Sequence, residues 1–220
     1  MIYDAHLHHK NKENGGFIIG LEGNPTFEGT LNNEEALKQH SIINRYIAFY
    51  YVSKEECRNK IVQWKYLKYH PRREKYSVDE VIESIYHNNP KAVIIDTLNE
   101  PFWQAYDYWK IARSFPKIPF IFAHAGGYLI NDFIKICHFQ SNVWIDFALT
   151  HTTLGKLGNV KTGLPYINQA IAYALNAPFK NRVLLSSDYP FFNQEEVFEY
   201  YKKDVSMLND NFEKLFELIK

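Results

Sequence analysis

The sequence predicts an α/β fold of one domain, residues 1–220, in which eight parallel strands close into a compact (β/α)8, or TIM, barrel. Short apolar runs rich in β-formers alternate with stretches of helical periodicity, which is the pattern of βαβ units and a parallel sheet. Eight runs are present, and eight strands are the number that closes a parallel barrel. They are residues 1–6, 17–21, 46–52, 66–70, 92–96, 120–124, 143–147 and 182–186.

The least regular part of this pattern surrounds the second run. Glycines and a proline between residues 9 and 25 can interrupt or shorten that strand. They match neither GxGxxG nor the P-loop, so we do not expect a phosphate-binding loop there.

The segments between the runs carry helix signals. Ser77 and Glu80 form a capping-box pattern before an apolar stripe, and Pro90 stops the helix. Asn193 and Glu196 repeat the capping pattern. The last helix places four apolar residues on one face: Phe212, Leu215, Phe216 and Ile219.

Composition excludes several classes of protein. Lys and Arg together number 25, as do Asp and Glu, and this neutrality argues against nucleic acid or acidic lipid as the main partner. The longest uncharged segment, residues 162–179, contains two prolines, so we expect no membrane span. We see no signal peptide and expect a cytoplasmic protein. The two cysteines are distant and unpatterned, so we expect structural thiols.

The chemistry is indicated first by His6 and His8. Side chains at i and i+2 leave the same face of a strand, so these two rings can converge on one metal ion while Leu7 packs behind them. Imidazole nitrogen suits zinc, iron, nickel or manganese, and Asp188 can complete the charge balance. The alternative is a chance pair, because the chain has nine histidines.

Polar residues fall at the carboxyl ends of the predicted strands, where barrel enzymes place their active sites. These residues are Asp4, His6, His8, Lys68, His70, Asp96, His124 and Asp188.

The motifs DAHLH, LKYHP, FAHAGG, NVWIDFA and RVLLSSDYP, in this order, resemble the amidohydrolase superfamily of metal-dependent hydrolases. The closest likeness is to the amidohydrolase-related branch, which includes aminocarboxymuconate semialdehyde decarboxylase and resorcylate-type decarboxylases. The resemblance implies that His6, His8 and Asp188 are metal ligands and that Asp188 also holds the proton of the attacking water. It implies that His124 is a catalytic histidine, as in the decarboxylases, or a ligand, as in other members.

The sequence departs from this family pattern at Asp96. Related sequences commonly place a ligand histidine at the end of strand five. Asp96 can still be a ligand, but its extra negative charge would weaken the Lewis acidity of the ion. Some superfamily members use a carboxylated strand-four lysine to bridge two metals, but we expect Lys68 to be unmodified and the site to hold one ion. That cofactor is a divalent metal, with zinc placed first and manganese, iron or nickel as alternatives.

Other polar residues are expected around this site. Lys68, His70 and His151 are candidate substrate contacts. Asp4 is expected to orient a ligand or accept a hydrogen bond at the strand end, and Asp146 to line the pocket or cap a neighbour.

Three functions remain open from the sequence. The first is a metal-dependent hydrolase that activates water against a small-molecule amide, ester or lactone. The second is a non-hydrolytic decarboxylase of a small carboxylic acid. The third is a degenerate, non-catalytic ligand-binding barrel, suggested by Asp96. In each case the partner is a small molecule, and a homodimer could close the pocket.

Overall fold

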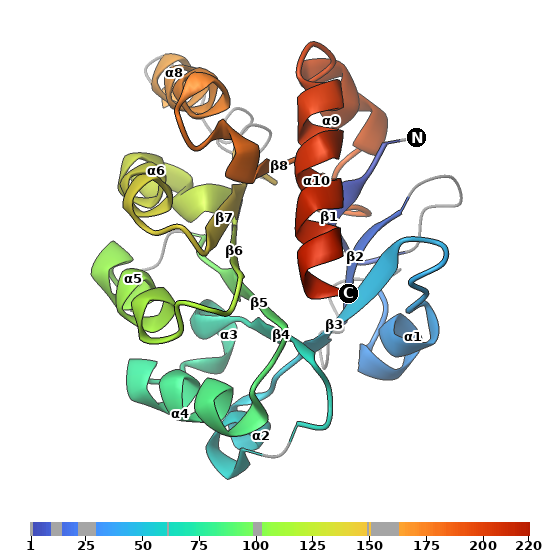
Figure 1. Ribbon diagram of the computed structural model, residues 1–220, viewed down its shortest axis with the longest axis vertical. Helices are drawn as coiled ribbons and strands as arrows, with labels where there is room; N and C mark the ends of the chain where they lie inside the picture. Colours follow the sequence, from blue (N-terminus) through green and yellow to red (C-terminus); the bar gives the residue numbers. More distant parts are fainter. Residues whose placement is uncertain are drawn as a thin grey trace.

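Eight parallel strands form one sheet with the order β1 to β8 (Figure 1). The computed structural model describes residues 2–9, 15–21, 30–60, 62–98, 103–148, 150 and 163–220. The strands are β1 (Asp4–Leu7), β2 (Gly16–Ile19), β3 (Tyr46–Tyr51), β4 (Tyr66–Tyr69), β5 (Ala92–Asp96), β6 (Phe120–Ala123), β7 (Val143–Asp146) and β8 (Val183–Leu184). Each lies within or beside a run predicted from the sequence, and the TIM-barrel prediction is confirmed.

Backbone hydrogen bonds close the seam between the last strand and the first. The amide of Ala5 donates to the carbonyl of Leu185 at 2.8 Å. Beyond it, the amide of Asp188 donates to the carbonyl of His6 at 2.9 Å. The amide of His8 then donates to Tyr189 at 2.7 Å. This seam therefore brings the segment after β8 alongside the end of β1.

Helices surround the strands, and two of them begin where the sequence predicts, after Ser77 and after Asn193. They are α1 (Asn33–Lys38), α2 (Lys54–Asn59), α3 (Pro71–Glu74), α4 (Val78–Asn88), α5 (Ala105–Ser114), α6 (Ile130–Phe139), α8 (Gly163–Asn176), α9 (Gln194–Tyr200) and α10 (Val205–Ile219), with 3-10 turns η1 (His124–Leu129) and η2 (Lys180–Arg182). Ser77 caps α4 in a complete capping box with Glu80. Asn193 also caps its helix, but its side chain accepts from the amide of Glu195, so the box predicted with Glu196 does not form.

Alternation along the strands creates two apolar layers. One layer joins the outer face of the sheet to α4, α5, α6 and α8. The other lies inside the ring of strands and includes Phe17, Phe49 and Ile121. Because successive side chains point to opposite faces, the inner face also receives polar residues nearer the carboxyl ends. Each of these shares its strand face with an apolar residue of the inner layer: Lys68 with Tyr66, Asp96 with Ile94, and Asp146 with Trp144.

The last helix covers the amino-terminal end of the barrel. The ring of Phe212 stacks on Tyr3, with 4.7 Å between ring centroids. The hydroxyl of Tyr66, at the start of β4, donates to the carbonyl of Ile219 at 2.9 Å. The side-chain amide of Asn211 donates to the carbonyl of Val183, the first residue of β8, at 2.8 Å. Figure 1 shows α10 crossing the middle of the view, and the apolar stripe predicted for this helix is buried as expected.

The sequence also makes predictions about membrane spans and about the two cysteines. None of the helices in the described part of the chain has the length and apolar character needed to cross a membrane. Cys57 and Cys137 are buried, free thiols, and burial raises the pKa of each to about 12.

Phe212→Ala tests the importance of the α10 contact. We expect it to lower the free energy of unfolding by about 3–5 kcal/mol, because it leaves a cavity against Tyr3 and Phe17. Urea denaturation followed by circular dichroism measures the loss. Leu218→Ala is the matched control, since Leu218 lies on the same helix with 65% of its surface exposed. Equal losses in the two variants would contradict a stabilising role for the Phe212 contact.

Candidate metal and substrate site

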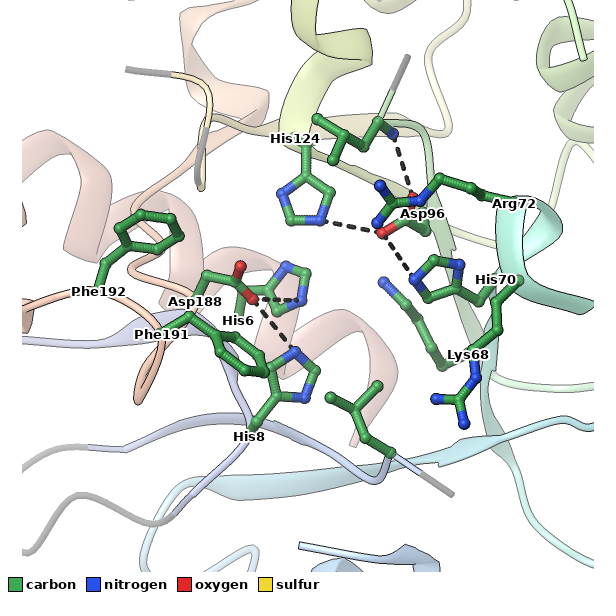
Figure 2. A pocket seen from close by; sticks show the side chains of 13 residues that line it. His6, His8, Lys68, His70, Arg72, Asp96, His124, Asp188, Phe191 and Phe192 are labelled. Carbon is green, nitrogen blue, oxygen red and sulfur yellow. Dashed lines mark hydrogen bonds and ion pairs between the residues drawn. The ribbon is translucent and has the colours of Figure 1, made fainter. Parts of the chain in front are cut away.

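A cavity of about 540 Å³ opens at the carboxyl ends of the strands (Figure 2). Histidines and carboxylates line its base, basic residues line the side formed by β4 and α3, and apolar side chains line the rest. The lining residues are His6, His8, Leu21, Lys68, His70, Arg72, Arg73, Asp96, Leu98, His124, Asp188, Phe191 and Phe192.

His6 and His8 converge on a single oxygen of Asp188. The Nε2 atoms of His6 and His8 lie 3.4 and 3.2 Å from Oδ1 of Asp188. All three residues are buried. Leu7 points the other way and packs with Ile18 of β2. The structure therefore brings together the three residues that the sequence resemblance implied as ligands.

Neighbouring groups fix the orientation of the two rings. Nδ1 of His8 lies 3.0 Å from the carbonyl of Ile19, so it carries the proton and leaves Nε2 with a lone pair. Nδ1 of His6 faces Oδ2 of Asp146 at 3.6 Å. Burial, aided by the charge of Lys68, lowers the pKa of His6 to about 4, so this ring is neutral at pH 7.

The spacing of these donor atoms fits a divalent ion. Two ligand atoms on one tetrahedral zinc lie about 3.3 Å apart. The distances from Asp188 to His6 and His8 match this value. His6, His124 and Asp146 also lie close enough to form a second candidate group. There, however, both ring nitrogens of His124 face other acceptors, the carbonyl of Ala148 and the carboxylate of Asp96, so we favour the group with Asp188.

Asp188 stands at a sharp turn immediately after the strand. Its φ of 61° lies in the left-handed region, which costs energy for a residue other than glycine and is often found at functional sites. Burial by itself would raise the pKa of Asp188, but His6, His8 and His124 together lower it. The carboxyl group is therefore ionised at neutral pH.

Asp96 belongs to a different cluster. Its Oδ2 lies 3.1 Å from Nε2 of His124 and 3.4 Å from Nε2 of His70. Its Oδ1 accepts the amide of Leu98 at 3.2 Å. Among the described residues, neither group of potential metal ligands contains Asp96. The geometry favours Asp96 as a partner of His124 over a role as a ligand.

Both ring nitrogens of His124 face acceptors. Nδ1 lies 2.8 Å from the carbonyl of Ala148, and Nε2 faces Asp96. Burial by itself would lower the pKa of His124, but the negative charge of Asp96 and its hydrogen bond prevail and raise it to about 9. The ring is thus held as a cation, which does not suit a metal ligand.

The glycines after His124 allow this turn. Four consecutive residues, His124 to Gly127, have positive φ. A Cβ on Gly126 would lie 2.1 Å from the ring of Phe133, so only glycine fits there. The HAGG motif therefore sets the backbone that aims His124 at the cavity.

Residues 98–217 match the amidohydrolase family, Amidohydro_2, and this match covers more than half of the chain. The chain belongs to the amidohydrolase family. The matched region includes His124 and Asp188, whereas His6 and His8 precede it.

Two solved structures with TM-scores above 0.6 support the fold of this amidohydrolase. One is an uncharacterised TIM-barrel protein from Bordetella bronchiseptica, with a TM-score of 0.66 and 14% identity over 93% of this chain and 78% of that chain. Another is a probable 2-pyrone-4,6-dicarboxylic acid hydrolase from Acinetobacter baumannii with citric acid bound, with a TM-score of 0.62 and 15% identity over 98% of this chain and 99% of that one. A 2,6-dihydroxybenzoate decarboxylase from Rhizobium has a TM-score of 0.48 and 15% identity over 84% and 74% of the two chains. No curated protein matches the sequence.

The amidohydrolase cavity also contains residues that sequence reasoning missed. Arg72 and Arg73 lie on α3, just after His70, and Phe191 and Phe192 follow the SDYP motif. Their position after the end of a strand could have identified them as cavity residues, but no motif singled them out. Lys68 and His70 line the cavity, whereas His151 lies outside the described residues.

Asp4 supports the site from behind. Its Oδ1 accepts the amides of His6 and Ser187, both at 3.0 Å. Its Oδ2 accepts the hydroxyl of Ser187 at 2.5 Å and the side-chain amide of Gln194 at 2.7 Å. Burial raises the pKa of Asp4 to about 6, against the lowering effect of these hydrogen bonds. Asp4 is thus the hydrogen-bond acceptor that the sequence predicts.

Asp4→Ala should lower the free energy of unfolding by about 3 kcal/mol or more, because it leaves several buried hydrogen-bond donors at the seam without an acceptor. Chemical denaturation checks this loss. Asp79→Ala is the control, because Asp79 is an exposed partner of Lys110 and its loss should cost less than about 1 kcal/mol. If Asp4→Ala were as mild as the control, the Asp4 hydrogen bonds would not be holding the seam.

Proposed function

We propose that this amidohydrolase is a metal-dependent hydrolase of a small molecule with an amide, ester or lactone bond. The observation that carries the proposal is the convergence of His6 and His8 on one oxygen of Asp188. A cavity of about 540 Å³ suits a small substrate. The acid named for the Acinetobacter neighbour is also small, although at 15% identity that likeness supports only the fold.

His6, His8 and Asp188 would hold the ion. Two imidazoles and one carboxylate suit zinc first, and also manganese, iron or nickel. When bound, the ion would supply Lewis acidity that polarises the substrate and makes water a better nucleophile near neutral pH.

Two side chains of the protein would then move or stabilise charge. Asp188, ionised in the site, accepts the proton of the attacking water and passes it to the leaving group. His124, held as a cation by Asp96, stabilises the negative charge that develops on the attacked oxygen. His70 also faces Asp96 and contributes to this wall of the cavity.

Metal analysis tests the ligand set. We expect wild-type protein to hold about one zinc or similar ion per chain, and His6→Ala and Asp188→Asn to lose it, because each removes a donor of the three. Asp96→Asn should keep the ion, because Asp96 lies with His124 instead. Elemental mass spectrometry measures the content of protein purified without chelator and then reconstituted with zinc.

The exposed His87 on α4 provides the control variant, His87→Ala, which should bind metal like the wild type. Loss of metal in Asp96→Asn would place Asp96 in the ligand set. A wild-type protein that binds no metal, even after reconstitution, would overturn the metal-dependent mechanism and favour the degenerate binding barrel.

A decarboxylase is the second candidate, and the geometry of His124 favours it. Both ring nitrogens of His124 face acceptors, so the ring carries two protons beside the cavity. Decarboxylation needs such a donor, because loss of CO2 from a carboxylate leaves a carbanion that must take up one proton.

Labelled water distinguishes the two reactions. In water enriched in oxygen-18, we expect one labelled oxygen in the acid product of a small ester, lactone or amide, with no CO2 release. His124→Asn should lower kcat by about 10²- to 10⁴-fold. His138→Asn, an exposed position on α6, is the matched control and should leave kcat unchanged. Release of CO2 from a carboxylic acid without label in the product would instead establish the decarboxylase.

The cytoplasmic location and the homodimer stay predictions from the sequence. A small-molecule substrate is part of the present proposal.

A further inference from the structure

Lys68 is a buried lysine that the proposed reaction does not use. It lies on β4 with 1% of its surface exposed and lines the cavity. Within the part of the chain that the structure describes, its Nζ atom has no hydrogen-bond partner. In Figure 2 the side chain reaches from β4 toward the centre of the cavity, across from Asp188.

A buried amine lowers the stability of the folded protein unless an acceptor binds its hydrogens. An ammonium group has three donors and no acceptor, and burial without a partner destabilises the folded protein. Burial lowers the pKa of Lys68, while the negative charges of Asp96, Asp146 and Asp188 oppose that effect and favour the ammonium form.

The nearby carboxylates do not pair with Lys68. Asp188 faces His6 and His8, and Asp96 faces His70 and His124. Oδ1 of Asp146 accepts two backbone amides, and Oδ2, which has no hydrogen-bond partner among the described residues, lies 3.6 Å from Nδ1 of His6. None of them forms an ion pair with Lys68 within 4.0 Å among the described residues. Among the described residues no acceptor lies within hydrogen-bonding distance of Lys68 Nζ, so a ligand that enters the cavity can supply one.

We propose that Lys68 binds a carboxylate of the substrate, and that the substrate is a small carboxylic acid with an apolar body. This inference rests on the proposed function and names its substrate class. Arg72 adds a second, half-buried cation at the rim, while Phe191, Phe192 and Leu98 offer apolar contact. A carboxylate held by Lys68 places the rest of the molecule against these walls and beside Asp188.

The experiment compares benzoate with benzamide, which has nearly the same shape but no charge. Titration calorimetry on protein stripped of metal isolates the lysine from any ion. We expect wild-type protein to bind benzoate and to bind benzamide more weakly. Lys68→Met, which keeps the length of the side chain, should weaken benzoate by about 10- to 100-fold, the loss of one charge-assisted hydrogen bond. Benzamide should be unaffected.

Two variants serve as controls, and circular dichroism checks their fold. Lys65→Met removes a lysine just before the other end of β4, where Nζ donates to the carbonyl of Asn88, and should leave benzoate binding unchanged. Arg72→Gln removes the rim cation and should weaken benzoate less than Lys68→Met, because Arg72 is more exposed.

A measurement on the wild type guards against misfolding of the Lys68 variant. Cyanate adds to a free amine to form a urea, and peptide mass spectrometry can compare Lys68 with Lys65. Benzoate should protect Lys68 and leave Lys65 reactive. Inorganic phosphate, as a second anion, should protect less, because it has no apolar body for the walls to contact.

Several results would overturn the proposal. In calorimetry these are an absence of benzoate binding by the wild type at up to about 10 mM (roughly −2.7 kcal/mol by the standard relation), or equal benzoate affinity in the wild type and Lys68→Met. A larger loss of benzoate affinity in Arg72→Gln than in Lys68→Met would also contradict it. In the cyanate experiment the contradicting result is that phosphate protects Lys68 as well as benzoate does. The metal test is separate. Benzoate binding that depends on Lys68 in a protein that never binds metal would keep this inference and remove the metallohydrolase, whereas bound metal with no role for Lys68 would do the reverse.

Discussion

The closure of the sheet between β8 and β1 is the constraint on which the site depends. The carboxylate of Asp4 accepts hydrogen bonds from His6 on one side of the seam and from Ser187 and Gln194 on the other. Backbone bonds from Ala5 and Asp188 run along the same line. Because His6 and Asp188 are both tied to this seam, closing the barrel and assembling the candidate metal ligands are one event. A barrel that opened here would separate the donors before it lost much of its apolar core.

Burial then decides what each charged group can do. At buried positions an isolated charge is unfavourable, so carboxylates and imidazoles must neutralise one another. The pairs form two clusters with different outcomes. Asp188 faces Nε2 of His8, whose Nδ1 proton is directed at the carbonyl of Ile19. The lone pair on Nε2 is therefore available for an ion. Asp96 meets His124, whose Nδ1 is already committed to a carbonyl, and so holds the ring as a cation. The same residue types thus provide a ligand set and a proton-rich wall a few ångströms apart.

The sequence could predict the positions of residues along strands but not their partners. Apolar runs identified all eight strands, and the period of two placed His6 and His8 on one face with Leu7 behind. The strand-end rule named the residues at the rim, including Asp188 and Lys68. It could not tell that Asp96 lies within hydrogen-bonding distance of His124, because that distance depends on the left-handed turn at His124 and on strand stagger. Nor could it find Arg72 or Phe191, because the short helix α3 and the turn after Asp188, which have no motif of their own, place them at the cavity. The capping box at Asn193 failed for a related reason: its side chain bonds the second amide of the helix, so the Glu196 carboxylate has no box to complete.

The two ends of the barrel divide stability from function. At the amino-terminal end, α10 supplies aromatic contacts and hydrogen bonds that need no outside partner. At the carboxyl end, Lys68 has no hydrogen-bond acceptor within the described part of the chain, and His124 and Asp188 adopt left-handed conformations. Each of these features costs stability where it stands. A fold can sustain them only if the rest of the core is well packed, and here the inner apolar layer and its contacts with α10 meet that condition. The groups that cost most in the free protein are therefore those whose cost a bound ligand can offset. For this reason the amine of Lys68, which has no hydrogen-bond partner among the described residues, indicates the substrate more directly than a contact already made within the protein.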